Sequence, residues 1–274
     1  MYAFLRFPGF KKKAFTLSYD DGVIYDKRLI EIFNENGLKA TFNLNSGHFG
    51  EGRRLSLDDA LALYKNSPHE VAVHGLKHRS LGEVNGFTAL SEVSLDRQNL
   101  EKSFGTIIRG MAYANGSFSD ETLEVLRRCG IVYSRTVRST ESFDIPTEWL
   151  TLDPTCHHAN PRLDELTEKF LDETSARHFY YEKPRLFYVW GHSYEFNDKD
   201  NWSLIESFAK KIGGHDNVWY ATNIEIYDYV KAYDSLIYSY DSELVTNPTA
   251  KDVYACFYGK DVLIPAGKTV KIND

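Results

Sequence analysis

The sequence has few cysteines and no cysteine pair at the spacing of a metal or redox site. Its 274 residues include only Cys129, Cys156 and Cys256, which lie far apart. An odd number of scattered cysteines without a CxxC pair argues against a disulfide framework. We therefore expect a hydrophobic core to stabilise the fold, and 42% hydrophobic residues are enough to build one.

The sequence also lacks an excess of positive charge and any long apolar run. Lys and Arg number 32 against 39 Asp and Glu, so the formal net charge is -7. Proteins that bind nucleic acids usually carry a basic patch, so we expect no nucleic-acid partner. We see no membrane-spanning stretch and no signal peptide, and therefore expect a cytoplasmic protein without a membrane partner. The sequence does not indicate an oligomeric state.

Short apolar runs alternate with amphipathic segments over most of the chain. This alternation is typical of repeated βα units around a parallel sheet. It predicts strands at AFTLSY (14–19), KATFNL (39–44), EVAVH (70–74), GMAY (110–113), IVYSRTV (131–137), RLFYVW (185–190) and NVWYA (217–221). Apolar residues at three- and four-residue spacing predict helices over residues 26–36, 57–65, 87–104, 120–129, 163–177, 202–212 and 224–233.

Seven strands, each followed by a helix, predict an α/β fold in the form of a distorted, incomplete (β/α)7-type barrel. The last forty residues differ, because β-rich runs such as VYACFYG and DVLIPAG are separated there by turn residues. We expect a barrel domain over residues 1–233 and a small β-rich C-terminal extension over residues 234–274.

Three of the predicted strands end in ionisable residues. Asp20 and Asp21 follow the first, His74 and His78 follow EVAV, and His192 follows LFYVWG. Each segment has an ordinary alternative: an Asp-Gly turn, a pair of surface histidines, or a structural histidine. All three, however, fall at the face of the barrel that carries active sites. Their coincidence favours one catalytic centre.

Two adjacent acids repel each other unless their roles differ. A metal ion separates the roles, because one carboxylate binds the ion while the other is free to accept a proton. Two histidines and one carboxylate leave positions open for water and substrate, as in catalytic metal sites. We predict that Asp21, His74 and His78 hold one divalent ion and that Asp20 is the catalytic base. Zn2+ suits these ligands best, and Co2+, Ni2+ or Mn2+ would also fit.

These segments resemble the polysaccharide deacetylases, the NodB-homology domains of carbohydrate esterase family 4, over residues 13–230. The family motif TFDDG appears here as SYDDG, HxxxH is present, and a histidine follows a late apolar strand. The resemblance implies the same roles for Asp20 and the metal ligands and makes His192 the general acid. It implies a hydrolase that removes an N-acetyl or other acyl group from an amino sugar or oligosaccharide and releases acetate.

The third family motif, RxPY, is altered in this sequence. The equivalent segment is MAYANG over residues 111–116, where alanine replaces both the arginine and the proline. The resemblance gives the backbone amide of Asn115 the role of holding the oxyanion and leaves the arginine position vacant, since Arg109 lies three residues too early. The fourth motif, DxxDW, is matched loosely by Asp144 to Trp149, which implies that Trp149 lines the pocket.

Further residues could contact the substrate. Tyr113 and Tyr194 lie near motif ends, where flat rings can stack on sugars, and His157 and His158 lie in a loop. The expected partner is an N-acylated carbohydrate or a small amide. Two alternatives stay open: hydrolysis of a small non-sugar amide on the same scaffold, and a non-catalytic carbohydrate-binding relative of the deacetylases.

Overall fold

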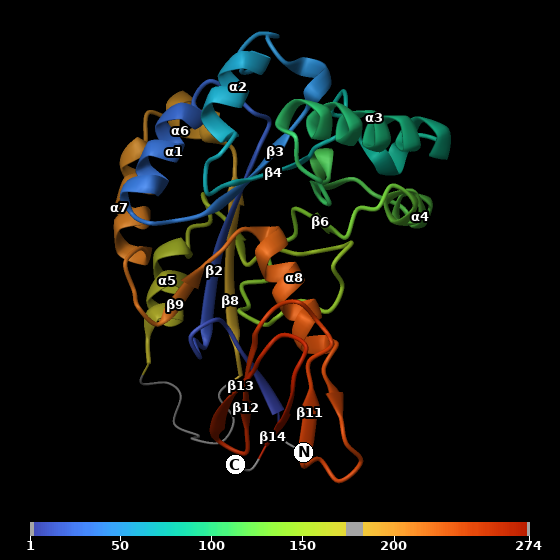
Figure 1. Cartoon of the computed structure of the whole chain (residues 1–274). Coiled ribbons are helices and arrows are strands. Elements are labelled where there is room, and N and C mark those ends of the chain that lie inside the picture. Colours follow the sequence, from blue (N-terminus) through green and yellow to red (C-terminus); the bar gives the residue numbers. More distant parts are fainter. Residues whose placement is uncertain (1–2, 174–182, 273–274) are drawn as a thin grey trace.

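The computed structural model describes residues 3–173 and 183–272 and has a curled parallel sheet at its centre (Figure 1). The strands are β2 (Lys13–Asp20), β3 (Ala40–Leu44), β4 (Glu70–Val73), β5 (Gly110–Ala112), β6 (Tyr133–Arg135), β7 (Cys156–His157), β8 (Arg185–Gly191) and β9 (Val218–Tyr220). Their order is β6-β5-β4-β3-β2-β8-β7, with β9 also paired to β2. The predicted α/β class and incomplete barrel are confirmed, because the sheet forms a half-barrel.

Strand β2 lies in the middle of this sheet. Its second half pairs with β3, its first half pairs with β9, and β8 runs along its other side. All eight residues of β2 are buried as a result. At the open edge the irregular residues 149–155 fill the gap: the Ser134 N–H of β6 donates to the Trp149 carbonyl, and the Thr155 N–H donates to the Tyr188 carbonyl of β8.

Helices flank the sheet and cover its outer face (Figure 1). Those described are α1 (Asp26–Glu35), α2 (Leu57–Tyr64), α3 (Gly86–Phe104), α4 (Asp120–Arg128), α5 (Leu163–Leu171), α6 (Ser193–Asp198), α7 (Trp202–Ile212) and α8 (Asn223–Asp234). Six predicted helices are correct to within one residue. The predicted helix over 163–177 ends at Leu171, and residues 174–177 lie outside the described part. None of the described helices is both long and apolar enough to cross a bilayer.

The residues of β2 alternate between two environments. Phe15, Leu17 and Tyr19 belong to the hydrophobic core between the sheet and the outer helices. Thr16 and Ser18, which have the opposite orientation, bond to polar side chains. The inner face of the barrel therefore carries polar groups, and each of them needs a hydrogen-bond partner.

Helix α8 lies between the barrel and the small C-terminal sheets (Figure 1). It begins at a capping box formed by Thr222 and Glu225. The Asn223 side chain accepts a hydrogen bond from Thr16 at 2.8 Å and donates one to the Tyr188 hydroxyl at 2.6 Å. The first turn of α8 thus provides partners for the polar interior.

A buried carboxyl group, Glu70 at the start of β4, links α8 to the sheet. It accepts hydrogen bonds from the Thr41 hydroxyl at 2.7 Å, the Tyr133 hydroxyl at 2.8 Å and the Ile224 N–H at 2.9 Å. Burial raises the pKa of Glu70 to about 7, although these three donors favour the charged form.

The two ends of the chain meet in small antiparallel sheets. One contains β1 (Ala3–Arg6), β12 (Val253–Phe257) and β13 (Lys260–Ile264), and the other contains β10 (Ile237–Tyr238), β11 (Leu244–Thr246) and β14 (Thr269–Lys271). The C-terminal residues are β-rich as expected, and one of their two sheets also contains the N-terminal strand β1. A domain boundary between residues 233 and 234 stays a prediction.

Glu70→Gln should reduce the pH dependence of stability. In the folded chain Glu70 keeps its proton up to about pH 7, whereas in the unfolded chain it loses the proton near its ordinary pKa of 4.5. The free energy of unfolding therefore falls as the pH rises between these values, by up to about 3 kcal/mol at about 1.4 kcal/mol per pKa unit. Urea unfolding at about pH 5 and pH 8 should show a smaller fall for the variant.

The control is Glu124→Gln, because the Glu124 side chain on α4 is exposed. This variant should keep the full pH dependence of the unmodified protein. If Glu70→Gln and Glu124→Gln lost equal stability between the two pH values, the raised pKa of Glu70 would be contradicted.

Candidate active site

The structure brings the three predicted metal ligands together at the carboxyl end of the barrel strands. Asp21 follows β2, and His74 and His78 follow β4. The Asp21 Oδ1 atom lies 3.8 Å from His74 Nε2 and 3.5 Å from His78 Nε2. All three candidate ligand atoms lie within 4.8 Å of one another, so these side chains could hold one ion.

The His74 ring has the tautomer that a ligand needs. Its Nδ1 atom lies 2.8 Å from the Ala112 carbonyl oxygen, which can only accept, so Nδ1 carries the hydrogen. The Nε2 atom then presents a lone pair, and it is buried without a hydrogen-bond partner among the described residues. Burial and the neighbouring His74 lower the pKa of His78 to about 4, so its imidazole is neutral near pH 7. This donor set fits zinc or a similar ion.

Buried polar groups fix the loops that carry these ligands. The Asp96 carboxylate of α3 accepts from the His74 N–H at 3.1 Å and from the Ser46 N–H at 2.7 Å. The Asn45 side chain donates to the carbonyls of His74 and Gly75 at 2.9 and 2.7 Å. The chain after β3 is thereby tied to the chain after β4.

Asp20, the predicted base, is buried beside the ligands. Its Oδ1 atom accepts a hydrogen bond from Asn43 of β3 at 2.8 Å, and its Oδ2 atom forms an ion pair with Arg135 of β6. Burial raises the pKa of the Asp20 carboxyl, but the Arg135 guanidinium, with the neighbouring His74 and His192, outweighs it and holds the pKa below its usual range. Asp20 is therefore a carboxylate that can accept a proton.

Arg135 was missed in the sequence. The third family motif places its arginine on β5, and that position holds no arginine here, as expected. Arg135, on the neighbouring strand β6, reaches the Asp20 carboxylate instead. Its guanidinium is fully buried, lies 4.2 Å from the centre of the Trp190 ring and also donates to the Thr136 carbonyl. The signal was an arginine in the middle of the apolar run IVYSRTV, on the same strand face as Tyr133.

His192, the predicted general acid, lies between two carboxylates. Its Nε2 atom is 3.8 Å from Asp20 Oδ2, and its Nδ1 atom is 2.9 Å from Glu195 Oε1 on α6. Burial lowers the pKa of His192, but the bond to Glu195 and the nearby acids outweigh it, so its pKa is raised. The imidazole is thus disposed to carry a proton on the side that faces Asp20.

Glu195 was also missed, and it joins the two histidines of the Thr155–His158 segment to His192. Its carboxylate lies 3.1 Å from His157 Nε2 and 2.7 Å from Lys199 Nζ. Burial raises the pKa of Glu195, but the bonds from the three histidines and Lys199 hold it far below its usual range. The His157 ring also accepts from the Ala159 N–H at its Nδ1 atom, so its Nε2 atom carries the hydrogen that faces Glu195.

His157, His158 and Glu195 also lie close enough together to hold an ion. The bonds described above favour another role, because Glu195 already receives hydrogen bonds from His157, His192 and Lys199. His158 is buried between Tyr19 and Phe196, and its Nδ1 atom occupies the space that a β-carbon at Gly191 would need. It therefore supports the site rather than presenting its ring to a substrate.

The other predicted substrate residues have unequal positions. Tyr194 lies beside His192, with ring centres 5.0 Å apart, and Asn115 lies in the turn after β5 with its side chain donating to Ser80. Tyr113 is buried, and its hydroxyl donates to the Leu150 carbonyl. Trp149 is buried against Tyr227 of α8, so we correct its predicted place at the pocket.

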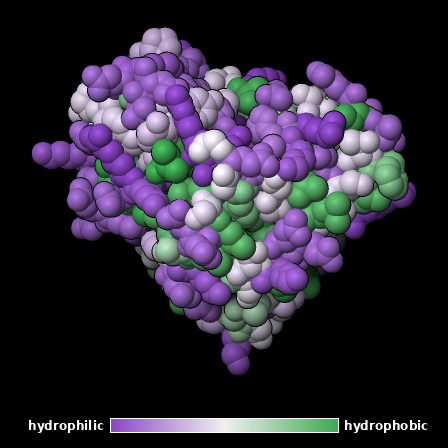
Figure 2. All heavy atoms as spheres, turned by 90° about the horizontal axis from the view of Figure 1, so that it is seen from above, coloured by the Kyte–Doolittle hydropathy of each residue, from purple (hydrophilic) through white to green (hydrophobic). Residues whose placement is uncertain are grey.

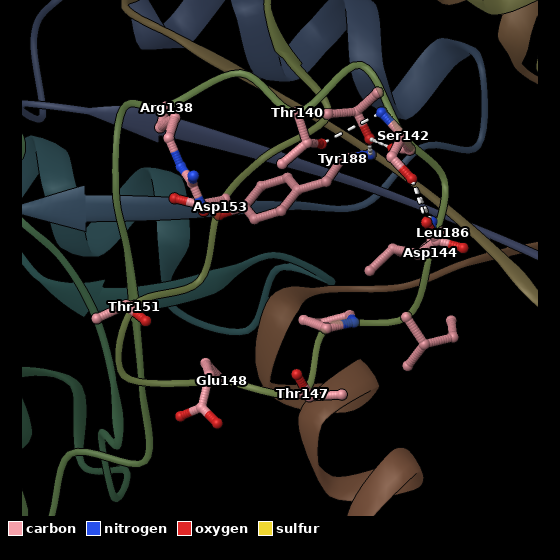
Figure 3. Close-up of a pocket in the computed structure, with 13 residues that line it drawn as sticks. Arg138, Thr140, Ser142, Asp144, Thr147, Glu148, Thr151, Asp153, Leu186 and Tyr188 are labelled. Atoms are coloured by element: carbon pink, nitrogen blue, oxygen red, sulfur yellow. Dashed lines mark hydrogen bonds and ion pairs between the residues drawn. The ribbon is translucent and has the colours of Figure 1, made fainter.

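The segment matched to the fourth motif lines a different cavity, which has a volume of about 340 Å3 (Figure 3). Asp144, Thr147 and Glu148 surround it together with Arg138 and Asp153, which form an ion pair. None of the predicted metal ligands or catalytic residues lines this cavity. The loose match to DxxDW did not predict the path of this irregular segment.

Comparisons with known proteins agree with the motifs. The polysaccharide deacetylase family model matches residues 8–134. One relative, provisionally described as a peptidoglycan-N-acetylglucosamine deacetylase from Arthroderma benhamiae, is 31% identical over 100 residues. That match covers 36% of this chain but only 22% of the relative.

Solved structures share the fold. One from Mycobacterium smegmatis, provisionally described as a polysaccharide deacetylase, has a TM-score of 0.60 and 15% identity over 85% of this chain and 95% of that chain. A CE4 family pseudoenzyme from Bacillus anthracis has a TM-score of 0.51 and 17% identity over 81% of this chain and 67% of that chain. The match to the polysaccharide deacetylase family model thus covers the residues that carry the SYDDG and HxxxH motifs.

Proposed function

We propose that this protein is a metal-dependent hydrolase that removes an N-acetyl or other acyl group from an amino sugar or oligosaccharide. This proposal is carried by one observation: a possible ligand triad, a buried carboxylate and a histidine whose pKa is raised lie together at one end of the barrel. One solved structure with this fold is called a pseudoenzyme. In this chain, the residues that we propose as base, metal ligands and acid are all present.

Each residue of the site has a separate role in the proposed amide hydrolysis. A divalent ion at Asp21, His74 and His78 would polarise the acyl carbonyl and lower the pKa of a water molecule. Asp20 accepts the proton of the attacking water, while Arg135 and Asn43 hold its carboxylate.

Bond cleavage needs a proton on the leaving nitrogen. His192 donates this proton as the carbon–nitrogen bond breaks, so that a free amine and acetate leave. The backbone amide of Asn115 stabilises the oxyanion. Glu195 is a positioning residue, because it holds His192 through the Nδ1 atom and leaves Nε2 to face the reaction.

The surface at this end of the barrel suits a substrate with both polar and apolar parts. Figure 2 shows this end from above, with apolar side chains among hydrophilic ones. Ile24, Phe118 and Val137 are exposed in the loops that follow β2, β5 and β6. Rings and apolar side chains next to a few polar groups are typical of sites for small organic ligands. The metal's identity and the cytoplasmic location stay predictions.

Metal analysis and acetate release test the proposal. Protein loaded with Zn2+, Co2+, Ni2+ or Mn2+ should release acetate from an N-acetylated sugar or a small amide, and a chelator should stop the reaction. Asp20→Asn should lower the rate by about 100-fold or more because the base is lost, while metal binding persists. Absence of turnover on a broad panel would favour a binding protein, and release only from non-sugar amides would favour the small-substrate alternative.

Arg135→Met should destabilise the protein by about 3 kcal/mol or more, because it leaves the Asp20 charge buried without its cation. Turnover should fall with it, and Arg135→Lys should be intermediate because lysine lacks the planar donor fork. Urea unfolding and initial rates measure both effects. The matched control is Arg138→Met, three residues further along and exposed. Equal stability and rate for the two methionine variants would refute the role of Arg135.

Glu195→Gln should lower kcat by about 10-fold or more, because His192 loses the carboxylate that orients its ring and raises its pKa. Metal affinity should not change, since Glu195 bonds to none of the three ligands. Lys199→Met, which removes a different partner of Glu195, is the control and should keep most of the activity. A weaker metal affinity in Glu195→Gln would instead indicate a general disturbance of the site.

A further inference from the structure

Asp21 has a backbone conformation that side chains seldom adopt. Its φ angle is +86°, in the left-handed region that favours glycine, and Gly22 follows with a φ of +61°. A β-carbon at Gly22 would meet the Leu44 side chain at 2.8 Å. A non-glycine residue stays in this region only where its surroundings hold it there.

A short stretch of chain before α2 runs beside this turn. The Ile24 N–H donates to the Arg53 carbonyl at 2.9 Å, and the Leu55 N–H donates to the Gly22 carbonyl at 2.8 Å. These two bonds bring Arg54 to Asp21. The Arg54 Nη1 atom lies 2.5 Å from the Asp21 carbonyl oxygen and 2.8 Å from its Oδ1 atom.

We infer that Arg54 is a positioning residue for the metal ligand. One guanidinium nitrogen contacts both the strained backbone and the carboxylate of Asp21, which fixes the carbonyl and the side chain relative to each other. The Oδ1 atom that Arg54 contacts is the oxygen that faces His74 and His78. A carboxylate oxygen can accept two partners at once, so the contact with Arg54 leaves room for a ligand bond.

The opposite effect of Arg54 is also physically reasonable. A second cation on the ligating oxygen repels a metal ion and would weaken its binding. We expect the positioning effect to be the larger of the two. Arg54 also contacts the Asp21 carbonyl, where it fixes the backbone and does not compete with an ion. Outer partners of a metal ligand typically contribute about 10- to 100-fold to metal affinity.

The test measures Zn2+ affinity by competition with a chromophoric chelator and requires no substrate. Arg54→Met should bind Zn2+ about 10- to 100-fold more weakly than the unmodified protein. Arg54→Lys should recover part of the loss. The matched control is Arg53→Met, because Arg53 is the preceding residue and pairs with Asp198 on the surface. Its affinity should be unchanged.

Circular dichroism and urea unfolding of the metal-free proteins show whether Arg54→Met is folded, and Arg54→Gln replaces it if it is not. Equal or tighter Zn2+ binding by the folded variant would overturn the inference. It rests on the metal site proposed above, and its failure is distinct: if the unmodified protein bound no Zn2+, the proposed function would fail before the variants were compared.

Discussion

A carboxylate that must stay charged inside a protein core determines much of this structure. Burial alone would raise the pKa of Asp20 and neutralise it. Arg135 prevents this, but its guanidinium is fully buried too and needs partners of its own, which are the Trp190 ring and the Thr136 carbonyl. Asn43 completes the set from β3. A single charge thus links four strands of the sheet, β2, β3, β6 and β8.

The same requirement extends through the barrel interior. Away from the candidate site, the inner face of the barrel carries Glu70, Thr16 and Tyr188. The first turn of α8 provides hydrogen-bond partners for these three side chains. At the carboxyl end of the strands, Asp96 bonds to the His74 N–H and Glu195 bonds to the His192 ring. Polar residues outside the family motifs therefore position those within them, and a motif alone describes only part of the site.

The fold and the motif residues could be predicted from the sequence because their signals are local. Apolar runs predicted seven of the eight strands of the parallel sheet, all but the two-residue β7. The strands that lead to Asp20, His74 and His192 end close together because parallel strands share an edge. Arg135 and Glu195 could not be paired in this way. Arg135 meets a partner 115 residues away, and its family position on β5 holds alanine. Glu195 lies in a helix of six residues, too short to show periodicity, and its partner His157 comes from a segment before α5.

The pairing of β1 with β12 has a consequence for the order in which the chain can fold. The four residues of β1 are synthesised about 250 residues before their hydrogen-bonding partners on β12. The strands of the half-barrel can assemble before β12 is made. Until then the edge of β1 is unpaired and could pair with other chains. Closing so long a loop is slow compared with local contacts. The sheet of β1, β12 and β13 can therefore form only after all strands of the half-barrel have been synthesised.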